Sequence, residues 1–178
     1  TLSFNSDEEA GQVDSQGGFT AGTRAGTYED GVTVEVTQGA VTKSATASVV
    51  VEPGALDHVV LEPVAPTVEV TKAQAFTAMA QDQYDNPIPG AQIGWEVAEG
   101  AGTIDAEGRL TTGTLAGAME RGVRATANLG TASTEATASV SVNPDPLDAV
   151  SLGPVEVLAG ATHQLEPAAV DQYGNRIQ

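Results

Sequence analysis

The sequence predicts an all-β fold made of repeated two-sheet β-sandwiches, and three observations predict it. A unit of about 90 residues recurs along the 178-residue chain. Within the unit, apolar and polar residues alternate with a period of two, which is typical of half-buried strands. The 20 glycines and 9 prolines separate these alternating segments as turn residues do. No apolar stripe with a 3.6-residue period competes with this pattern, so we expect about seven strands per unit.

The repeat is evident in a gap-free alignment of residues 1–63 with residues 92–154 at an offset of 91. Between residues 10–63 and their equivalents, 25 of 54 positions are identical. A further match, AQDQYDNPI at 80–88 with VDQYGNRI at 170–177, needs an offset of 89, so two residues are lost near Pro154. Self-similarity at a fixed period indicates repeated structural modules.

The register of the repeat divides the chain into three segments. Residues 1–55 are the C-terminal part of one repeat, here called repeat I. Residues 56–147 form a complete repeat, repeat II, and residues 148–178 hold the N-terminal strands of the next, repeat III. The two partial copies together contain roughly one full unit. Two explanations remain open: the segment is a window from a longer array, or its two ends complete each other across neighbouring chains.

Each strand of the unit is expected from alternation. The apolar positions, in chain order, are Val59 and Leu61 with a continuation at Val68 and Val70, then Phe76, Ala78 and Ala80, then Ile93, Trp95 and Val97, a tight pair at 102–113, then Val123, Ala125 and Ala127, and last Ala136, Ala138, Val140 and Val142. The residues expected to form the structural core are Phe4, Trp95, Phe76, Val123 and Val140. Trp95 and its counterpart Phe4 are each expected between the sheets, because isolated aromatic residues on strands are usually buried.

The turn after the second strand, DQYDNPIPG at 82–90, has a defined expected geometry. Asp82 and Asn86 suit a turn stabilised by side-chain hydrogen bonds to the backbone. Gly174 replaces Asp85 in the last copy, which predicts a left-handed backbone at that position.

Charge excludes several partners. The formal net charge is −17, so phosphate backbones and anionic lipid surfaces would repel the chain, and we expect no nucleic-acid partner. No apolar run approaches the roughly 18 residues of a membrane span, so we expect no membrane insertion in this segment. The absence of cysteine excludes disulfides, thiolate metal sites and cysteine nucleophiles.

A catalytic site is not expected, so the chain is not predicted to be an enzyme. The two histidines, His58 and His163, occupy different places in the repeat, and Ala149 stands where His58 should recur. No nucleophile elbow or phosphate-binding loop accompanies them. We therefore predict no catalytic residue and no bound cofactor.

Calcium is the one metal that remains an alternative. It needs six to eight oxygen ligands, and the junctions VEPGALD and VNPDPLD, with the turn after the second strand, supply weak candidates: Glu52, Asp57, Asp82, Asn143, Asp145 and Asp148. No D-x-D-x-D-G loop is present, and acidic residues near prolines are often solvated linkers.

The same junctions are too short to act as free tethers, so neighbouring units are expected to hold a limited range of orientations.

The order of these motifs resembles a known family. DQYDNPIPG, a strand bearing Trp95, GTIDAEGRLTTG and a final TASVSV strand before LD..V.L.P resemble the bacterial immunoglobulin-like repeats of surface proteins and adhesins, the group that includes invasin and intimin modules. The resemblance implies immunoglobulin-like sandwiches and an extracellular or cell-surface location.

An intramolecular Lys–Asn/Asp crosslink, known from some bacterial surface sandwiches, would need Lys43 or Lys72, and neither recurs in the repeat.

Two functions follow from this reading. In the first, the tandem repeats form a structural stalk, fibre or surface-layer rod, with neighbouring repeats or identical chains as head-to-tail partners through strand complementation. In the alternative, loops at a domain end make an adhesin module that binds a host receptor or glycan. An aromatic content of only 4% favours the structural function, because binding loops usually carry aromatic anchors.

Overall fold

The computed structural model describes residues 1–177, and no helix occurs among them. The strands in order are β1 (Leu2–Ser6), β2 (Gly11–Val13), β3 (Phe19–Ala21), β4 (Gly26–Gln38), β5 (Val41–Val51), β6 (His58–Glu62), β7 (Thr67–Glu69), β8 (Ala73–Ala75), β9 (Thr77–Gln81), β10 (Gln92–Val97), β11 (Gly102–Ile104), β12 (Arg109–Thr112), β13 (Gly117–Leu129), β14 (Ala132–Asn143), β15 (Ala149–Ser151) and β16 (Ala168–Val170). The expected all-β fold is confirmed for the described residues.

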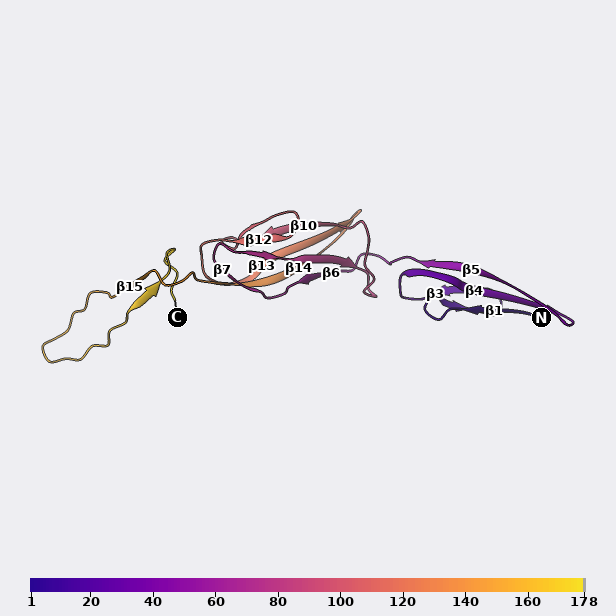
Figure 1. The fold of residues 1–178 in the computed structure, drawn as a ribbon, viewed down its shortest axis with the longest axis horizontal. Coiled ribbons are helices and arrows are strands. Elements are labelled where there is room, and N and C mark those ends of the chain that lie inside the picture. The colour runs from indigo at the N-terminus through magenta and orange to yellow at the C-terminus, as the bar shows by residue number, and fades with distance from the viewer. Residues whose placement is uncertain (178) are drawn as a thin grey trace. The chain divides into compact units, whose positions relative to one another are not determined.

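Repeat II contains the complete set of sheets. A four-stranded sheet has the order β10-β13-β14-β7, a three-stranded sheet has the order β11-β12-β8, and β6 pairs with β9 (Figure 1). Nine strands lie in this repeat rather than about seven, partly because the expected second strand is interrupted at Phe76. There the backbone N–H of Phe76 donates to Gly108, so β8 joins β12 while β9 joins β6. The segment expected to form one strand therefore contributes β8 to one sheet and β9 to another.

Repeat I reproduces the strand pairing of the second half of this sandwich. Its sheet β1-β4-β5 pairs Phe4 with Val34, as Trp95 pairs with Ala125 in β10-β13. Both long strands also shift register at a bulge, where Asp30 and Arg121 have φ angles of 55° and 54°. The 91-residue offset thus holds for strand pairing as well as for sequence.

The core of repeat II lies between its sheets. Phe76, Val123 and Val140 are buried there. Phe4 and Trp95 are only half-buried, which corrects the expectation of two rings enclosed between the sheets. A Cβ on Gly108 would lie 2.7 Å from the Trp95 ring, and one on Gly17 would lie 3.1 Å from the Phe4 ring. Each ring therefore lies against a turn glycine.

The chain folds into two compact units. The first comprises Thr1–His58 and Ala80–Ala91, and the second comprises Val59–Met79 and Gln92–Gln178. The first unit thus takes the turn after β9 from repeat II. The segment boundaries at residues 55 and 147 follow from the repeat alone and stay a prediction.

Repeat III is only partly ordered into strands. β15 pairs with β16 in an antiparallel ladder, the counterpart of β6 with β9. Residues 152–167 between them form no strand and are drawn as a long loop at the yellow end of the chain (Figure 1).

Candidate functional site

One face of the repeat I sheet is uncovered among the described residues. Val36 is 50% exposed, whereas its equivalent in repeat II, Ala127, is fully buried. In the separate β2–β3 pair, Phe19 is 38% exposed, and its equivalent Leu110 in β12 is fully buried. Because the register is the same and all four residues are apolar, the difference lies in what covers the sheet. In repeat II, residues 59–79 contribute the covering strands.

Repeat I also has open strand edges. In repeat II the N–H groups of Ser139 and Ser141 donate to Val64 and Pro66, and β14 then pairs in parallel with β7. The equivalent residues in β5 are Ser48 and Val50, and they make no such bond to any described residue. Likewise β12 pairs with β8, whereas β3 pairs, within residues 1–177, only with β2. An open edge of this kind is a template for a further strand.

Repeat III carries apolar residues that match the missing cover. Leu152 is 52% exposed and corresponds to Leu61, which is 4% exposed. Leu165 is 48% exposed and corresponds to Phe76, which is 2% exposed. Val150 and Val157 are likewise exposed, while their counterparts in repeat II are buried. Among the described residues, repeat I therefore has an uncovered apolar face. Repeat III has exposed apolar residues whose equivalents in repeat II are buried.

The turn after β9 is a closed hydrogen-bonded loop. Asp82 is buried, and its Oδ1 accepts hydrogen bonds from the N–H groups of Tyr84 at 2.8 Å and Asn86 at 3.0 Å. Its Oδ2 accepts from Gly54 N–H at 2.6 Å and from the Asn86 side chain at 2.9 Å. Asp85 has a φ of 63°, which confirms the left-handed position expected from Gly174.

Asn86 extends from this loop to a segment of repeat I. Its Nδ2 donates to the carbonyl of Thr23 at 2.7 Å, and its Oδ1 accepts from the N–H of Ala25 at 2.8 Å. Asn86 is buried, and with these bonds both ends of its amide are paired. The loop and residues 23–25 belong to the same compact unit.

The same arrangement recurs in the last copy. Asn175 donates to the carbonyl of Thr114 at 2.8 Å and accepts from the N–H of Ala116 at 2.8 Å. Asp171 accepts from the N–H of Asp145 at 2.9 Å and from the side chain of Asn175 at 2.8 Å. Thr114, Ala116 and Asp145 lie 91 positions after Thr23, Ala25 and Gly54. The contact is therefore a repeated feature of the unit.

These hydrogen bonds control the ionisation of both aspartates. Burial by itself raises the pKa of Asp82, but the Asn86 side chain and the backbone N–H groups of Gly54, Asn86 and Tyr84 lower it more, to about 2. Burial also opposes ionisation of Asp171, and the corresponding donors again leave its pKa below the usual value. Both side chains are therefore held as carboxylates.

The structure does not assemble the weak calcium candidates into one site. Among residues 1–177, no group of three or more His, Asp or Glu side chains is placed to hold a metal ion. Asp82 already accepts N–H donors at both oxygens, and such donors oppose a cation. Asp57 lies beside the His58 ring at 3.0 Å, and Asp145 accepts from the side chain of Gln172 at 2.6 Å. Glu52, Asn143 and Asp148 are exposed.

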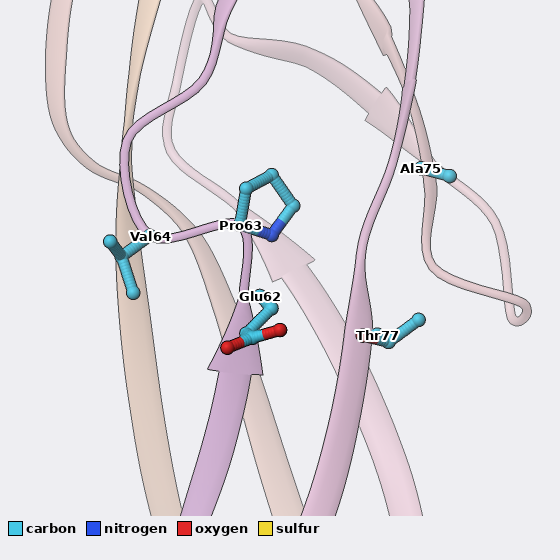
Figure 2. Close-up of a pocket in the computed structure, with 5 residues that line it drawn as sticks. All are labelled: Glu62, Pro63, Val64, Ala75 and Thr77. Atoms are coloured by element: carbon cyan, nitrogen blue, oxygen red, sulfur yellow. The ribbon is translucent and has the colours of Figure 1, made fainter.

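One hollow of the described surface, of about 530 Å³, is lined by Glu62, Pro63, Val64, Ala75 and Thr77. Figure 2 shows Glu62 at the end of its strand, Pro63 directly after it, and Thr77 on the neighbouring strand. One carboxylate and one hydroxyl make up its polar side chains, so it presents no acid–base pair.

The two histidines lie in different surroundings. His58 contacts Gln81 at 3.1 Å and Asp85 at 3.4 Å, and His163 lies in the strandless segment of repeat III.

Comparison with solved structures finds partial likeness to proteins of bacterial and animal origin. InvD of Yersinia pseudotuberculosis is 21% identical over 99% of this chain and 61% of its own, with a TM-score of 0.47. The Escherichia coli adhesin FdeC is 19% identical over 88% of this chain and 54% of its own, with a TM-score of 0.45. The S-layer protein SbsC is 22% identical over 99% of this chain, with a TM-score of 0.38. The chain spans 24% of that S-layer chain.

No family model and no curated protein matches the chain. Among the described residues, none forms a helix of the length and hydropathy that a membrane span requires.

The contacts of Asn86 and Asn175 were missed by the sequence analysis. It assigned Asp82 and Asn86 to a local turn, and that part is confirmed by the bonds within the loop. The sequence holds one signal for the contact of Asn86 with repeat I, because the segment that Asn86 binds recurs as well: Thr23 matches Thr114, and Ala25 matches Ala116. A repeated loop and a repeated segment indicate a contact only when the topology that brings them together is known.

Proposed function

We propose that this chain is a structural segment of an extracellular or cell-surface array of immunoglobulin-like repeats that builds a stalk, fibre or surface layer. The main support is the recurrence of strand pairing at the same offset in repeats I and II, because solenoid-like arrays are built from units that each contact their neighbours. The acidic surface, with a net charge of −17, suits a solvated location and opposes non-specific association.

We further propose that identical chains join head to tail by strand complementation. The covering strands that repeat I lacks among the described residues have counterparts in repeat III of a second copy. Repeat III already pairs β15 with β16 in the manner of β6 with β9. At the 89-residue offset, residues 156–158 correspond to β7 and residues 162–164 to β8. In a second copy, these two segments are the ones that would add as strands to the open edges of β5 and β3.

The apolar faces support the same partner. Val150 in β15 and Leu152 directly after this strand alternate with Ser151, as buried Val59 and Leu61 alternate with exposed Val60 in β6. Burying such side chains stabilises an interface by about 25 cal/mol for each Å² of apolar surface. A contact between two different surfaces does not close on itself, so it extends into a filament.

Sedimentation velocity over a range of concentrations tests this assembly. The wild-type chain is expected to form dimers and longer species as concentration rises, and deletion of residues 148–178 is expected to leave monomers. Leu152→Asp should abolish association, because it places a carboxylate in the new core, whereas the matched control Ser151→Asp faces the opposite side and should associate like wild type. Wild-type protein that stays monomeric at millimolar concentration, or Leu152→Asp protein that associates normally, would show that a second copy does not cover repeat I.

A further inference from the structure

We propose that the loop from Asp82 to Asn86, and its copy from Asp171 to Asn175, couple the folding of each repeat to the folding of the repeat before it. Each loop follows the second strand of a pair in its own repeat, β9 of the β6–β9 pair or β16 of the β15–β16 pair. Each asparagine nevertheless bonds to the G-T-x-A-G segment of the preceding repeat, at residues 22–26 or 113–117. The inference goes beyond the proposed function and does not depend on assembly.

In the preceding repeat, the loop asparagine recognises backbone atoms only. Asn86 bonds to the carbonyl of Thr23 and the N–H of Ala25, and the residue between them is Arg24. In the last copy the residue between the two bonded positions is Leu115. A primary amide has one donor end and one acceptor end, and both ends are used on the same three-residue segment. This pairing explains how the contact persists while the central side chain changes from a cation to an apolar group.

The aspartate adds a second point of attachment. Asp82 binds the N–H of Gly54, and Asp171 binds the N–H of Asp145, both in the junction that leads out of the preceding repeat. The same carboxylate accepts from the asparagine amide and so fixes its orientation. Each loop therefore holds two separate parts of the preceding repeat, its G-T-x-A-G segment and its exit.

Burial makes these bonds consequential for stability. Asp82 and Asn86 are 1% and 7% exposed, and all buried polar side-chain atoms of the described residues have hydrogen-bond partners. If repeat I unfolded, the carboxylate and amide would lose partners that water replaces only after the loop opens. Unfolding one repeat should therefore destabilise the loop of the next, which is a nearest-neighbour coupling between repeats.

Hydrogen exchange of the full chain at dilute, monomeric concentration tests the coupling, and the two loops serve as controls for each other. Asn86→Ala is expected to speed exchange of the Ala25 and Gly54 amides about tenfold or more and to speed the β4–β5 ladder amides as well. The amides of Ala116 and Asp145 should keep their wild-type rates. Asn175→Ala should produce the reverse pattern, with faster exchange at Ala116, Asp145 and the β13–β14 ladder.

The ladder amides separate coupling from a merely local role. Asn128→Ala, at an exposed position on β13, controls for loss of an amide side chain. It should leave the exchange rates of the loop-bound amides and of both ladders unchanged. If acceleration stays within the loop, or if the Ala25 amide is unchanged by Asn86→Ala, the coupling is wrong. Should Asn86→Ala fail to fold, Asn175→Ala gives the same decision at the less buried copy. The test needs no association, so its failure is distinguishable from failure of the assembly.

Discussion

Repeats I and II show one sheet in two environments. Their long hairpins, β4–β5 and β13–β14, share strand register and bulge position. In repeat II this sheet is covered and its inward side chains are buried, whereas in repeat I the equivalent face is open. The two hairpins therefore share one strand register although their described cover differs. Burial of the face depends on a segment with the pattern of residues 59–79.

The largest expected effect tests the difference in covering residues. Phe76→Ala should destabilise repeat II by about 3 to 5 kcal/mol, because it removes a buried ring and leaves a cavity. Leu165→Ala, at the equivalent but exposed position of repeat III, should change stability by less than about 0.5 kcal/mol in dilute protein. Denaturant unfolding followed by the fluorescence of Trp95, the one tryptophan, measures repeat II directly. Equal effects of the two changes would mean that the repeats do not differ in cover.

A smaller contrast is expected at the turn glycines beneath the half-buried rings. Gly108→Ala combines a φ of 81° with a Cβ 2.7 Å from both the Phe76 carbonyl oxygen and the Trp95 ring, so it should cost more than about 2 kcal/mol. Gly17→Ala has a φ of 84°, but its nearest neighbour is the end of the Phe4 ring at 3.1 Å, which can move. Its cost should be about 1 to 2 kcal/mol. Circular dichroism during thermal unfolding ranks the two, and a larger loss at Gly17 would contradict the packing.

Acid should weaken the loop that Asp82 closes. The folded pKa of Asp82, about 2, lies below its ordinary value of 3.8, so the carboxylate form is favoured in the folded protein. Its stabilisation is fully present above about pH 4 and is lost as the pH falls towards 2. In Asp82→Asn protein this part of the acid dependence should disappear. Unfolding midpoints measured between pH 5 and pH 2 give the comparison, and parallel curves for wild type and variant would contradict the assigned hydrogen bonds.

The smallest effect is expected from calcium removal. Both oxygens of Asp82 accept N–H donors, and the other candidate ligands are not gathered around a common point in the described residues. Thermal unfolding with excess chelator should therefore give the same midpoint as unfolding with added calcium. A chelator-dependent decrease would establish a calcium site at the junctions.

The sequence predicted those features that depend on local pattern and repetition. Alternation located most strands, and the exchange of Asp85 for Gly174 identified a left-handed position that the backbone shows. Burial was harder to predict, because Trp95 and Phe4 are large aromatic residues on strands, as core residues often are, but they are only half-buried and lie against turn glycines. The contacts of Asn86 depend on strand topology, which brings residues 61 to 63 positions apart together. A contact between residues so far apart in the sequence leaves no periodic pattern from which it could be predicted.

Hydrogen exchange at the β5 edge tests the head-to-tail account most directly. In repeat II the amides of Ser139 and Ser141 donate to Val64 and Pro66, and they should exchange slowly at every concentration. The equivalent amides of Ser48 and Val50 should exchange rapidly in dilute wild-type protein and become protected as concentration rises. If these two amides remain unprotected at concentrations where sedimentation shows association, repeat III of a second chain does not complete repeat I.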